Sequence, residues 1–163
     1  MKFSDGPPGK GKKRRGRSLG VFLVLLAFAP GAAATLGAGP NSVENDRIQL
    51  RGTLHLERAA AFEVHEIRAV TGVVVREYVA GGVVFGLAWE GPVTPDLTQL
   101  LGAYYEPFLQ AAEEQRAQRR GRGPVLVHLP DLIVELGGHM RAFAGRAYLP
   151  ARLPQGVPAE AVR

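Results

Sequence analysis

The stretch Phe62–Glu90, FEVHEIRAVTGVVVREYVAGGVVFGLAWE, decides the fold. Its β-branched and aromatic residues fall into three runs, separated by turn signals at Val70-Thr71-Gly72 and at Gly81-Gly82. The runs are Phe62–Ala69, Val73–Ala80 and Val83–Trp89. Connections of two or three residues join antiparallel neighbours. The stretch therefore predicts a three-stranded antiparallel meander with Val73–Ala80 in the middle.

Charge selects the register of the first hairpin. A two-residue turn would place Glu66 opposite Glu77, and like charges directly opposite each other destabilise a sheet. A three-residue loop, with Gly72 in the left-handed conformation, places Glu66 opposite Arg76 and His65 opposite Glu77 instead. We therefore expect the second register.

The second hairpin, closed by Gly81-Gly82, is expected to place Tyr78 beside Phe85 and Val74 beside Trp89. One face of the meander would then carry Val64, Tyr78, Phe85, Leu87 and Trp89 around Glu66 and Arg76. The other would carry Ile67, Val73, Val75, Val79 and Val84 around His65 and Glu77. Both faces are largely apolar, so both are expected to be covered at least in part.

Helical signals flank the meander. Upstream, Asn41 or Ser42 can cap a short helix that ends at Leu50, and the alternation in Arg51–Glu57 indicates a strand. Downstream, Thr94 is expected to be the N-cap of a helix, with Pro95 in its first position and Pro107 as the point where it kinks or ends. A second helical stretch is predicted over Phe108–Arg120.

Further short strands are predicted after the helices, at Val125–Leu129, Leu132–Leu136 and Met140–Leu149, with a turn at Gly137-Gly138. The predicted fold class is therefore α+β. We expect a single domain in which a mostly antiparallel sheet packs on one main helix. Along the chain, a three-stranded meander is followed by a helix and then by further short strands.

The first 34 residues have the features of an export signal. A basic segment precedes the apolar run Leu19–Ala29, which is too short to span a bilayer, and Pro30 and small residues follow it. We expect residues 1–34 to be a signal peptide cleaved after Ala34, 35–157 to be the domain, and 158–163 to be a C-terminal tail. The expected location is periplasmic or secreted, with membrane contact only through the leader during export. An uncleaved leader that tethers the protein to the membrane is the alternative.

The charge of the chain belongs mainly to this leader. The chain has a net charge of +5, but its first 34 residues hold seven of the 20 Lys and Arg residues and one of the 15 acidic ones. The remainder is near neutral and contains no lysine, so nucleic acid is not an expected partner. The absence of cysteine excludes disulfides, thiolate metal sites and a thiol nucleophile.

The sequence resembles the bacterial domain-of-unknown-function family 2844 over Ser42 to about Val157. The resemblance rests on Val64-His65-Glu66, on Gly72-x-Val74-Val75-Arg76-Glu77-Tyr78-Val79, on Val84-Phe85-x-x-Ala88-Trp89-x-Gly91-Pro92, on Pro95-Asp96-Leu97-x-Gln99-Leu100-Leu101-Gly102, and most specifically on Gly137-Gly138-His139-Met140-Arg141-Ala142-Phe143-x-Gly145-Arg146-Ala147-Tyr148-Leu149-Pro150. The resemblance implies a short exported protein of one domain. It implies no activity and supplies no catalytic residues.

Catalytic and metal-binding patterns are weak. His55, His65, His128 and His139, with Glu66, Glu77 or Glu135 in support, have no metal-ligand spacing, so neither a metal nor another cofactor is expected. The exported part has one serine, Ser42, and no nucleophile elbow. The alternative to a non-enzymatic protein is a small hydrolase, metal- or carboxylate-dependent, that uses His65, Glu77 or His139.

We expect a non-enzymatic envelope or secreted interaction module that contacts another protein or an apolar ligand. The candidate contact residues are Trp89, His139, Arg141, Arg146 and Tyr148. Trp89 belongs to the predicted aromatic cluster, although aromatic clusters more often form core. Arginines in a strand are costly unless they are exposed or paired, so the segment from His139 to Tyr148 is expected to face a partner or acidic side chains, or to be an edge strand protected by its charge.

Overall fold

A computed structural model of the chain describes residues 1–2, 35–118 and 123–163. The helices are α1 (Asn41–Gln49), α2 (Leu97–Leu101) and α3 (Tyr105–Gln118), with short 3-10 turns at Gly102–Tyr104, Pro150–Arg152 and Ala159–Ala161. The strands are β1 (Thr53–Arg58), β2 (Glu63–Arg68), β3 (Val74–Ala80), β4 (Val83–Gly91), β5 (Val125–His128), β6 (Ile133–His139) and β7 (Ala142–Tyr148).

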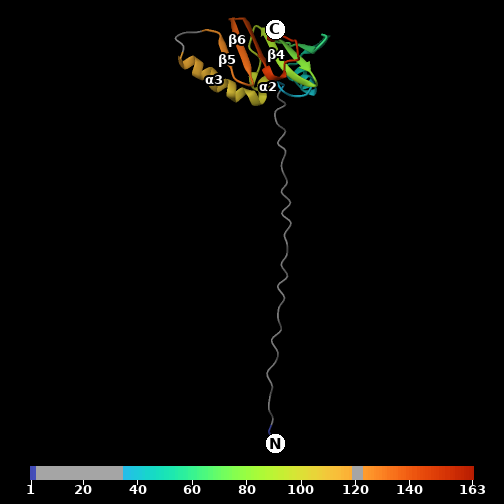
Figure 1. The fold of residues 1–163 in the computed structure, drawn as a ribbon, viewed down its shortest axis with the longest axis vertical. Coiled ribbons are helices and arrows are strands. Elements are labelled where there is room, and N and C mark those ends of the chain that lie inside the picture. Colours follow the sequence, from blue (N-terminus) through green and yellow to red (C-terminus); the bar gives the residue numbers. More distant parts are fainter. Residues whose placement is uncertain (3–34, 119–122) are drawn as a thin grey trace.

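The strands form one seven-stranded sheet in the order β1-β2-β3-β4-β7-β6-β5 (Figure 1). Every neighbouring pair is antiparallel. The meander β1–β4 forms one half, and the helical segment 97–118 leads to the second meander, β5–β7, whose last strand returns to β4. The predicted α+β fold class, with a mostly antiparallel sheet packed on one main helix, is confirmed.

The two faces of the sheet are covered by different parts of the chain. On the helix face, Val75, Leu87 and Trp89 pack with residues of the helices, among them Leu101 and Phe108. On the tail face, a smaller cluster joins Tyr78, Phe85 and Ala88 to Val162 at the end of the chain. In Figure 1 the helices α2 and α3 accordingly lie on one side of the sheet, and the C-terminus lies on the other.

The register of the first hairpin is as predicted. Glu66 lies opposite Arg76, and His65 lies opposite Glu77. Gly72 has a φ of 84°, the left-handed conformation that the three-residue loop requires. Cross-strand charge pairing therefore identified the correct register.

The register predicted for the second hairpin was wrong. Tyr78 lies opposite Gly86, and Trp89 lies opposite Val75, because the register shifts between Tyr78 and Val79. The partners of β3 pass from Gly86 to Val84, which leaves Phe85 as the extra residue of a β-bulge. The bulge moves Leu87 and Trp89 from the expected tail face to the helix face, while Phe85 stays beside Tyr78.

The helices lie near their predicted positions, but their caps differ, and the predicted helix end at Arg119 and Arg120 lies outside the described residues. Helix α1 follows Pro40, and no side chain caps it. The N-cap of α2 is Asp96, whose carboxylate accepts hydrogen bonds from the backbone of Thr98 and Gln99, so Thr94 was the wrong assignment. Pro107 lies in the first turn of α3, where a backbone N–H would have no acceptor within the helix, so the missing N–H of proline costs nothing there. The chain bends instead at Gly102, which has a φ of 51°.

The hairpin of the second meander turns later than predicted. Strand β6 continues through Gly137 and Gly138 to His139, and the turn lies at Met140 and Arg141. Gly138 is nevertheless essential at its position, because a Cβ atom there would lie 2.1 Å from the carbonyl oxygen of Ala142. Its role is to allow close approach of the backbones within the hairpin rather than to form the turn.

The proposed leader, residues 1–34 with its cleavage position at Ala34, lies outside the described residues except for Met1 and Lys2. Among the described residues, no helix has the length and apolar character needed to cross a membrane.

Candidate functional site

The two edges of the sheet differ in how they are protected. At the β5 edge, the side-chain amide of Gln115 on α3 donates to the Leu126 carbonyl oxygen at 2.8 Å and accepts from the Leu126 backbone N–H at 3.1 Å. Gln115 thereby occupies the outward backbone groups of Leu126, which another strand would use. The described residues provide no comparable contact to the outer side of β1.

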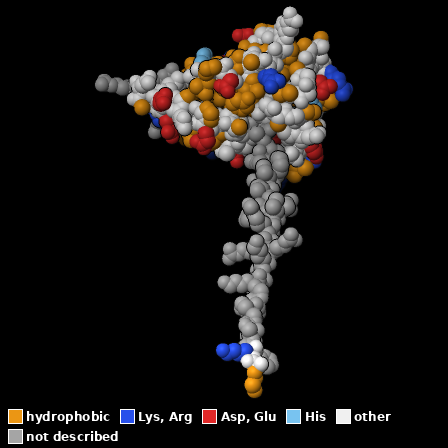
Figure 2. Space-filling model, turned by 60° about the horizontal axis from the view of Figure 1, so that its bottom comes forward, with side chains coloured by type: hydrophobic (Ala, Val, Ile, Leu, Met, Phe, Trp, Pro, Cys, Tyr) orange, Lys and Arg blue, Asp and Glu red, His pale blue; other side chains and the backbone are white. Residues whose placement is uncertain are grey.

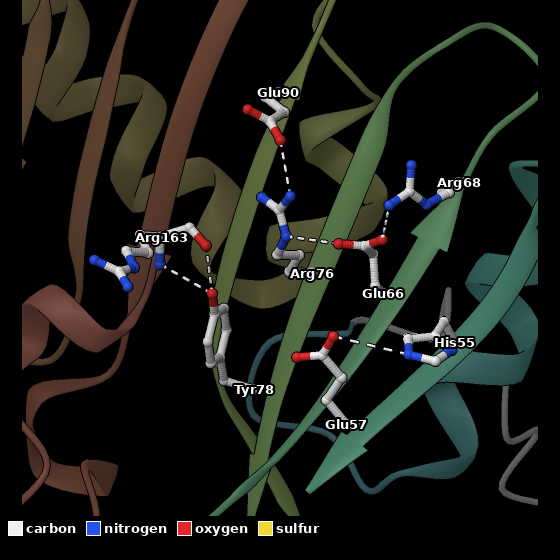
Figure 3. Close-up of polar contacts among 8 residues, drawn as sticks. All are labelled: His55, Glu57, Glu66, Arg68, Arg76, Tyr78, Glu90 and Arg163. Carbon is white, nitrogen blue, oxygen red and sulfur yellow. Dashed lines mark hydrogen bonds and ion pairs between the residues drawn. The ribbon is translucent and has the colours of Figure 1, made fainter. Parts of the chain in front are cut away.

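Strand β1 is exposed along its whole length. Its apolar side chains, Leu54 and Leu56, are 39% and 37% exposed. On the same strand, His55 Nε2 lies 3.8 Å from Glu57 Oε1 (Figure 3). An open edge strand with exposed apolar side chains is a ready template for pairing with another strand.

A pair of carboxyl groups is buried on the helix face, although carboxyl groups usually remain in contact with water. Glu77 on β3 and Asp46 on α1 are both fully buried. Asp46 accepts hydrogen bonds from the Thr35 hydroxyl and from the Gln99 side-chain amide. Apart from its neighbour Asp46, no polar group of the described residues reaches either buried oxygen of Glu77.

This burial changes the protonation of the pair. Loss of solvation and the neighbouring charge of Asp46 raise the pKa of Glu77 to about 9. Burial also raises the pKa of Asp46, although the hydrogen bonds from Gln99 and from Glu77 act in the opposite direction. Two carboxyl groups that share a dry site cannot both be ionised without a compensating cation, so one proton is held between them.

The segment before α1 is fixed next to this pair. The Leu36 N–H donates to Leu100 O at 3.0 Å, the Gly37 N–H donates to Val84 O at 2.8 Å, and the Val84 N–H donates to Ala38 O at 2.9 Å. Thr35 is buried, and its hydroxyl group bonds to Asp46. The folded structure therefore holds the chain in place as far back as Thr35.

His65 is not the partner of Glu77, although the backbone places the two residues opposite each other. His65 Nε2 lies 3.5 Å from Glu63 Oε2, on its own strand, and neither ring nitrogen makes a hydrogen bond within the described residues. The partner of Glu77 is Asp46, which comes from a helix that the sheet register could not reveal.

The tail face carries a ladder of charged side chains across β2, β3 and β4 (Figure 3). Arg76 bonds to Glu66 at 2.9 Å and to Glu90 at 2.8 Å, and Arg68 bonds to Glu66 at 2.7 Å. Burial raises the pKa of Glu66, but the two arginines more than offset this and hold it below its usual value. These groups neutralise one another, so they are structural.

Arg146 has the acidic partner that the sequence analysis considered. Its guanidinium group forms two bonds with Glu135, at 2.9 and 2.8 Å, and lies 5.8 Å from the centre of the Tyr148 ring. It also donates to the carbonyl oxygens of Ala159 and Val162, at 3.2 and 3.4 Å. Arg146 therefore fastens the C-terminal segment to the sheet.

The C-terminal segment is docked, and Val162 is its anchor. Val162 is fully buried and lies so close to Gly86 that a Cβ atom there would be 2.9 Å from it. Tyr78 adds a hydrogen bond from its hydroxyl to Arg163 O and accepts one from the Arg163 N–H at 3.0 Å (Figure 3).

We predict that Val162→Ala lowers the free energy of unfolding by about 1.5 kcal/mol, because two buried methyl groups are lost at ~0.8 kcal/mol each. Urea denaturation measures the change. Val70→Ala is the matched control, because Val70 is 75% exposed and should cost little. Equal losses in the two variants would show that Val162 does not anchor the segment.

The other predicted contact residues are separated. Trp89 is buried under the helices at 2% exposure, whereas His139 and Arg141 are exposed at the tip of the β6–β7 hairpin. An open groove of about 410 Å³ lies over the second meander, with Trp89, Leu136 and Arg146 among its lining residues. The predicted contact residues therefore do not form one surface: Trp89 lies in the core, Arg146 lines the groove, and His139 and Arg141 lie at the hairpin tip.

The structure does not bring the candidate hydrolase residues together. Across the sheet, Glu77 on β3 lies opposite Leu87 on β4, Leu87 lies opposite Ala147 on β7, and Ala147 lies opposite Val134 on β6. His139 is five residues further along β6 than Val134, or roughly 17 Å at the rise of a strand. Across the described residues there is also no group of three or more His, Asp or Glu side chains that could hold a metal ion.

Sequence reasoning missed three residues of these sites: Thr35, Asp46 and Gln115. Asp46 carried a weak signal, because α1 is a mostly polar helix that nevertheless has to cover a sheet. Gln115 lies in a run of polar residues and carried no signal, since its role depends on the position of β5.

The face shown in Figure 2 combines apolar side chains with acidic and basic ones, as expected for a near-neutral domain.

The fold and its sites define an antiparallel α+β domain with one open sheet edge and a buried carboxyl pair. A sequence profile of the family described as "Protein of unknown function (DUF2844)" matches residues 32–162. The chain therefore belongs to this family, as its motifs suggested. Comparisons with curated proteins and with solved structures returned no match.

Proposed function

We propose that this protein is an exported, non-enzymatic interaction module that joins a second copy of itself through the open edge of β1. The observation that carries the proposal is the difference between the two sheet edges. Gln115 occupies the β5 edge, while β1 is exposed and bears Leu54 and Leu56. Pairing through β1 would extend the sheet and cover these side chains.

Export is supported by the leader, and its removal after Ala34 is compatible with the fold. The described hydrogen bonds at the start of the domain begin at Thr35, whose carbonyl oxygen accepts from the Ala38 N–H at 3.1 Å and whose hydroxyl bonds to Asp46. A cut after Ala34 therefore removes nothing that the described hydrogen bonds require. The exported module would act in the periplasm or outside the cell. N-terminal sequencing of the exported protein tests the cut, and recovery of the uncut chain would support the membrane-tethered alternative.

The hydrogen-bond pattern of β1 determines how a second strand can pair with it. The Ala59 N–H donates to Phe62 O at 2.9 Å, so these two residues form a hydrogen-bonded pair in the β1–β2 ladder. Hydrogen-bonded and non-hydrogen-bonded pairs alternate along an antiparallel ladder. The backbone groups of Leu54, Leu56 and Arg58 therefore point away from β2 and are available to another strand.

Two copies of β1 can pair about a twofold axis at Leu56. This register places Leu56 opposite its copy and Leu54 opposite Arg58, so all the outward backbone groups of these residues are used. It also places His55 opposite Glu57 twice, and the His55 ring can donate a hydrogen bond to a carboxylate. A shift that centres the axis on His55 or Glu57 would instead place identical polar groups opposite each other.

Charge exchange tests this register. We predict that Glu57→Lys weakens self-association at least about tenfold, because two favourable cross-strand pairs per dimer become unfavourable. The double variant His55→Glu, Glu57→Lys should restore association, because the new carboxylate at position 55 would then face the new ammonium group at position 57 of the second copy. Sedimentation velocity over a concentration series measures both effects.

The Glu57→Lys substitution also changes the net charge of the protein, so a matched control is needed. Glu114→Lys makes the same change on the exposed surface of α3 and should leave association unaltered. Two results would contradict the proposal: a wild-type protein that remains monomeric at every concentration, or a double variant that is as weak as Glu57→Lys. Association that persists unchanged in Glu57→Lys would place the contact on another surface, such as the groove beside Arg146.

A further inference from the structure

Within residues 35–118 and 123–163, the buried carboxyl pair has no positive partner. Glu77 has an exposure of 0%, and the part of the chain that the structure describes offers its two buried oxygens no donor other than Asp46. Asp46 has one bond from Gln99 and one from Thr35, both from uncharged groups. Buried carboxyl groups are normally paired with a cation or fully hydrogen-bonded, so this site is incomplete.

Thr35 is placed to complete it. The Thr35 hydroxyl is in contact with Asp46, and only three covalent bonds separate that hydroxyl oxygen from the Thr35 nitrogen. The nitrogen therefore lies within roughly 6 Å of the carboxyl group, which is the range over which opposite charges favour each other's ionised form. In the full chain this nitrogen is a neutral peptide amide.

We propose that Asp46 and Glu77 form a binding site for the α-ammonium group of Thr35, which leader removal creates. The inference rests on the export part of the proposed function, namely cleavage after Ala34. Cleavage turns a neutral amide into a cation next to Asp46, one of the two carboxyl groups that are buried among the described residues. The processed chain would thus gain an internal ion pair that the uncut chain cannot form, and processing would stabilise the fold.

The titration of this site has a defined direction. The titratable groups that face it are Asp46 from α1 and Glu77 from β3, with His65 on the neighbouring strand. Nearby carboxylates raise the pKa of an ammonium group. While the pair keeps one ionised carboxyl group, the stabilisation would therefore be fully present below the pKa of the unfolded α-amine, about 7.7–8.0, and would be lost as the pH rises through the higher folded value.

The sequence provides an unusually clean way to observe this group. No lysine occurs after residue 34, so the α-amine of Thr35 would be the single amine of the processed chain. Reductive methylation with ¹³C-formaldehyde would label it alone and keep its charge. Acetylation would modify the same nitrogen and remove the charge, which makes the two products a matched pair.

We expect the labelled amine of the folded, processed protein to titrate at least about one pH unit above the same amine in urea, a tenfold change in proton affinity. Glu77→Gln should reduce this shift, whereas Glu114→Gln on exposed α3 should leave it unchanged. Acetylated protein should unfold at a lower temperature than methylated protein at pH 7. An amine that titrates as in urea, with equal melting temperatures of the two products, would overturn the inference.

This experiment separates the inference from the proposal on which it rests. If sequencing shows a different first residue, the cleavage proposal fails, and a chain that starts at Thr35 can still be released from a cleavable fusion for the titration. If sequencing confirms Thr35 but its amine titrates normally, the inference alone fails. Self-association through β1 does not enter either readout.

Discussion

Replacing Trp89 with alanine is expected to lower the free energy of unfolding by about 3–5 kcal/mol, the usual cost of removing a large buried aromatic side chain. Trp89 is 2% exposed and packs between the sheet and the helices. Its ring also lies directly over Gly145 on β7, where a Cβ atom would come within 2.4 Å of it. The indole therefore connects the two meanders, and urea denaturation followed by circular dichroism measures its contribution.

Gly145 provides an internal check on this explanation. Gly145→Ala should be strongly destabilising in the wild-type protein, because the added methyl group meets the indole ring. It should cost less in the Trp89→Ala background, although the Glu135 carbonyl oxygen, at 2.9 Å from that Cβ position, still limits the relief. Strictly additive losses would show that the two residues do not contact each other as described.

The full, uncut chain is expected to lose stability as the pH rises from about 4.5 to about 9. The pKa of Glu77 is about 9 in the folded protein, against an ordinary value of 4.5 that applies when the chain is unfolded. Between these values the unfolded state releases the proton and the folded state keeps it. The slope is at most about 1.4 kcal/mol per pH unit and is negative, because the folded state binds more protons.

The Glu77→Gln variant isolates this effect. Glutamine has nearly the same shape and does not titrate in this range, so the variant should show a much flatter profile of unfolding free energy against pH. Chemical denaturation of the uncut chain at several pH values provides the measurement. A wild-type profile as flat as that of the variant would mean that Glu77 ionises normally and is not confined with Asp46.

Much of the sheet could be predicted because the signals were local. The connection length and the charges at Glu66, Arg76 and Glu77 determined the first hairpin correctly. The second hairpin was wrong because a bulge adds one residue without any local signature beyond Gly86. In a strand with period two, one extra residue moves every later side chain to the other face, which is why Trp89 was misplaced.

The candidate sites were less predictable because they depend on contacts between distant segments. Asp46 and Glu77 lie on elements separated by two strands, and neither belongs to a recognisable motif. The difference between the β1 and β5 edges appears only when Gln115 is seen against Leu126. The charge of the leader, by contrast, could be separated from that of the domain by composition alone.

Hydrogen exchange at β1 tests self-association through this edge most directly. The amides of Leu54, Leu56 and Arg58 should become more slowly exchanging as protein concentration rises, because they enter hydrogen bonds with the second copy. The Leu126 amide, already bonded to Gln115, should not change. Exchange at Leu54, Leu56 and Arg58 that is fast and equal at all concentrations would contradict self-association through β1.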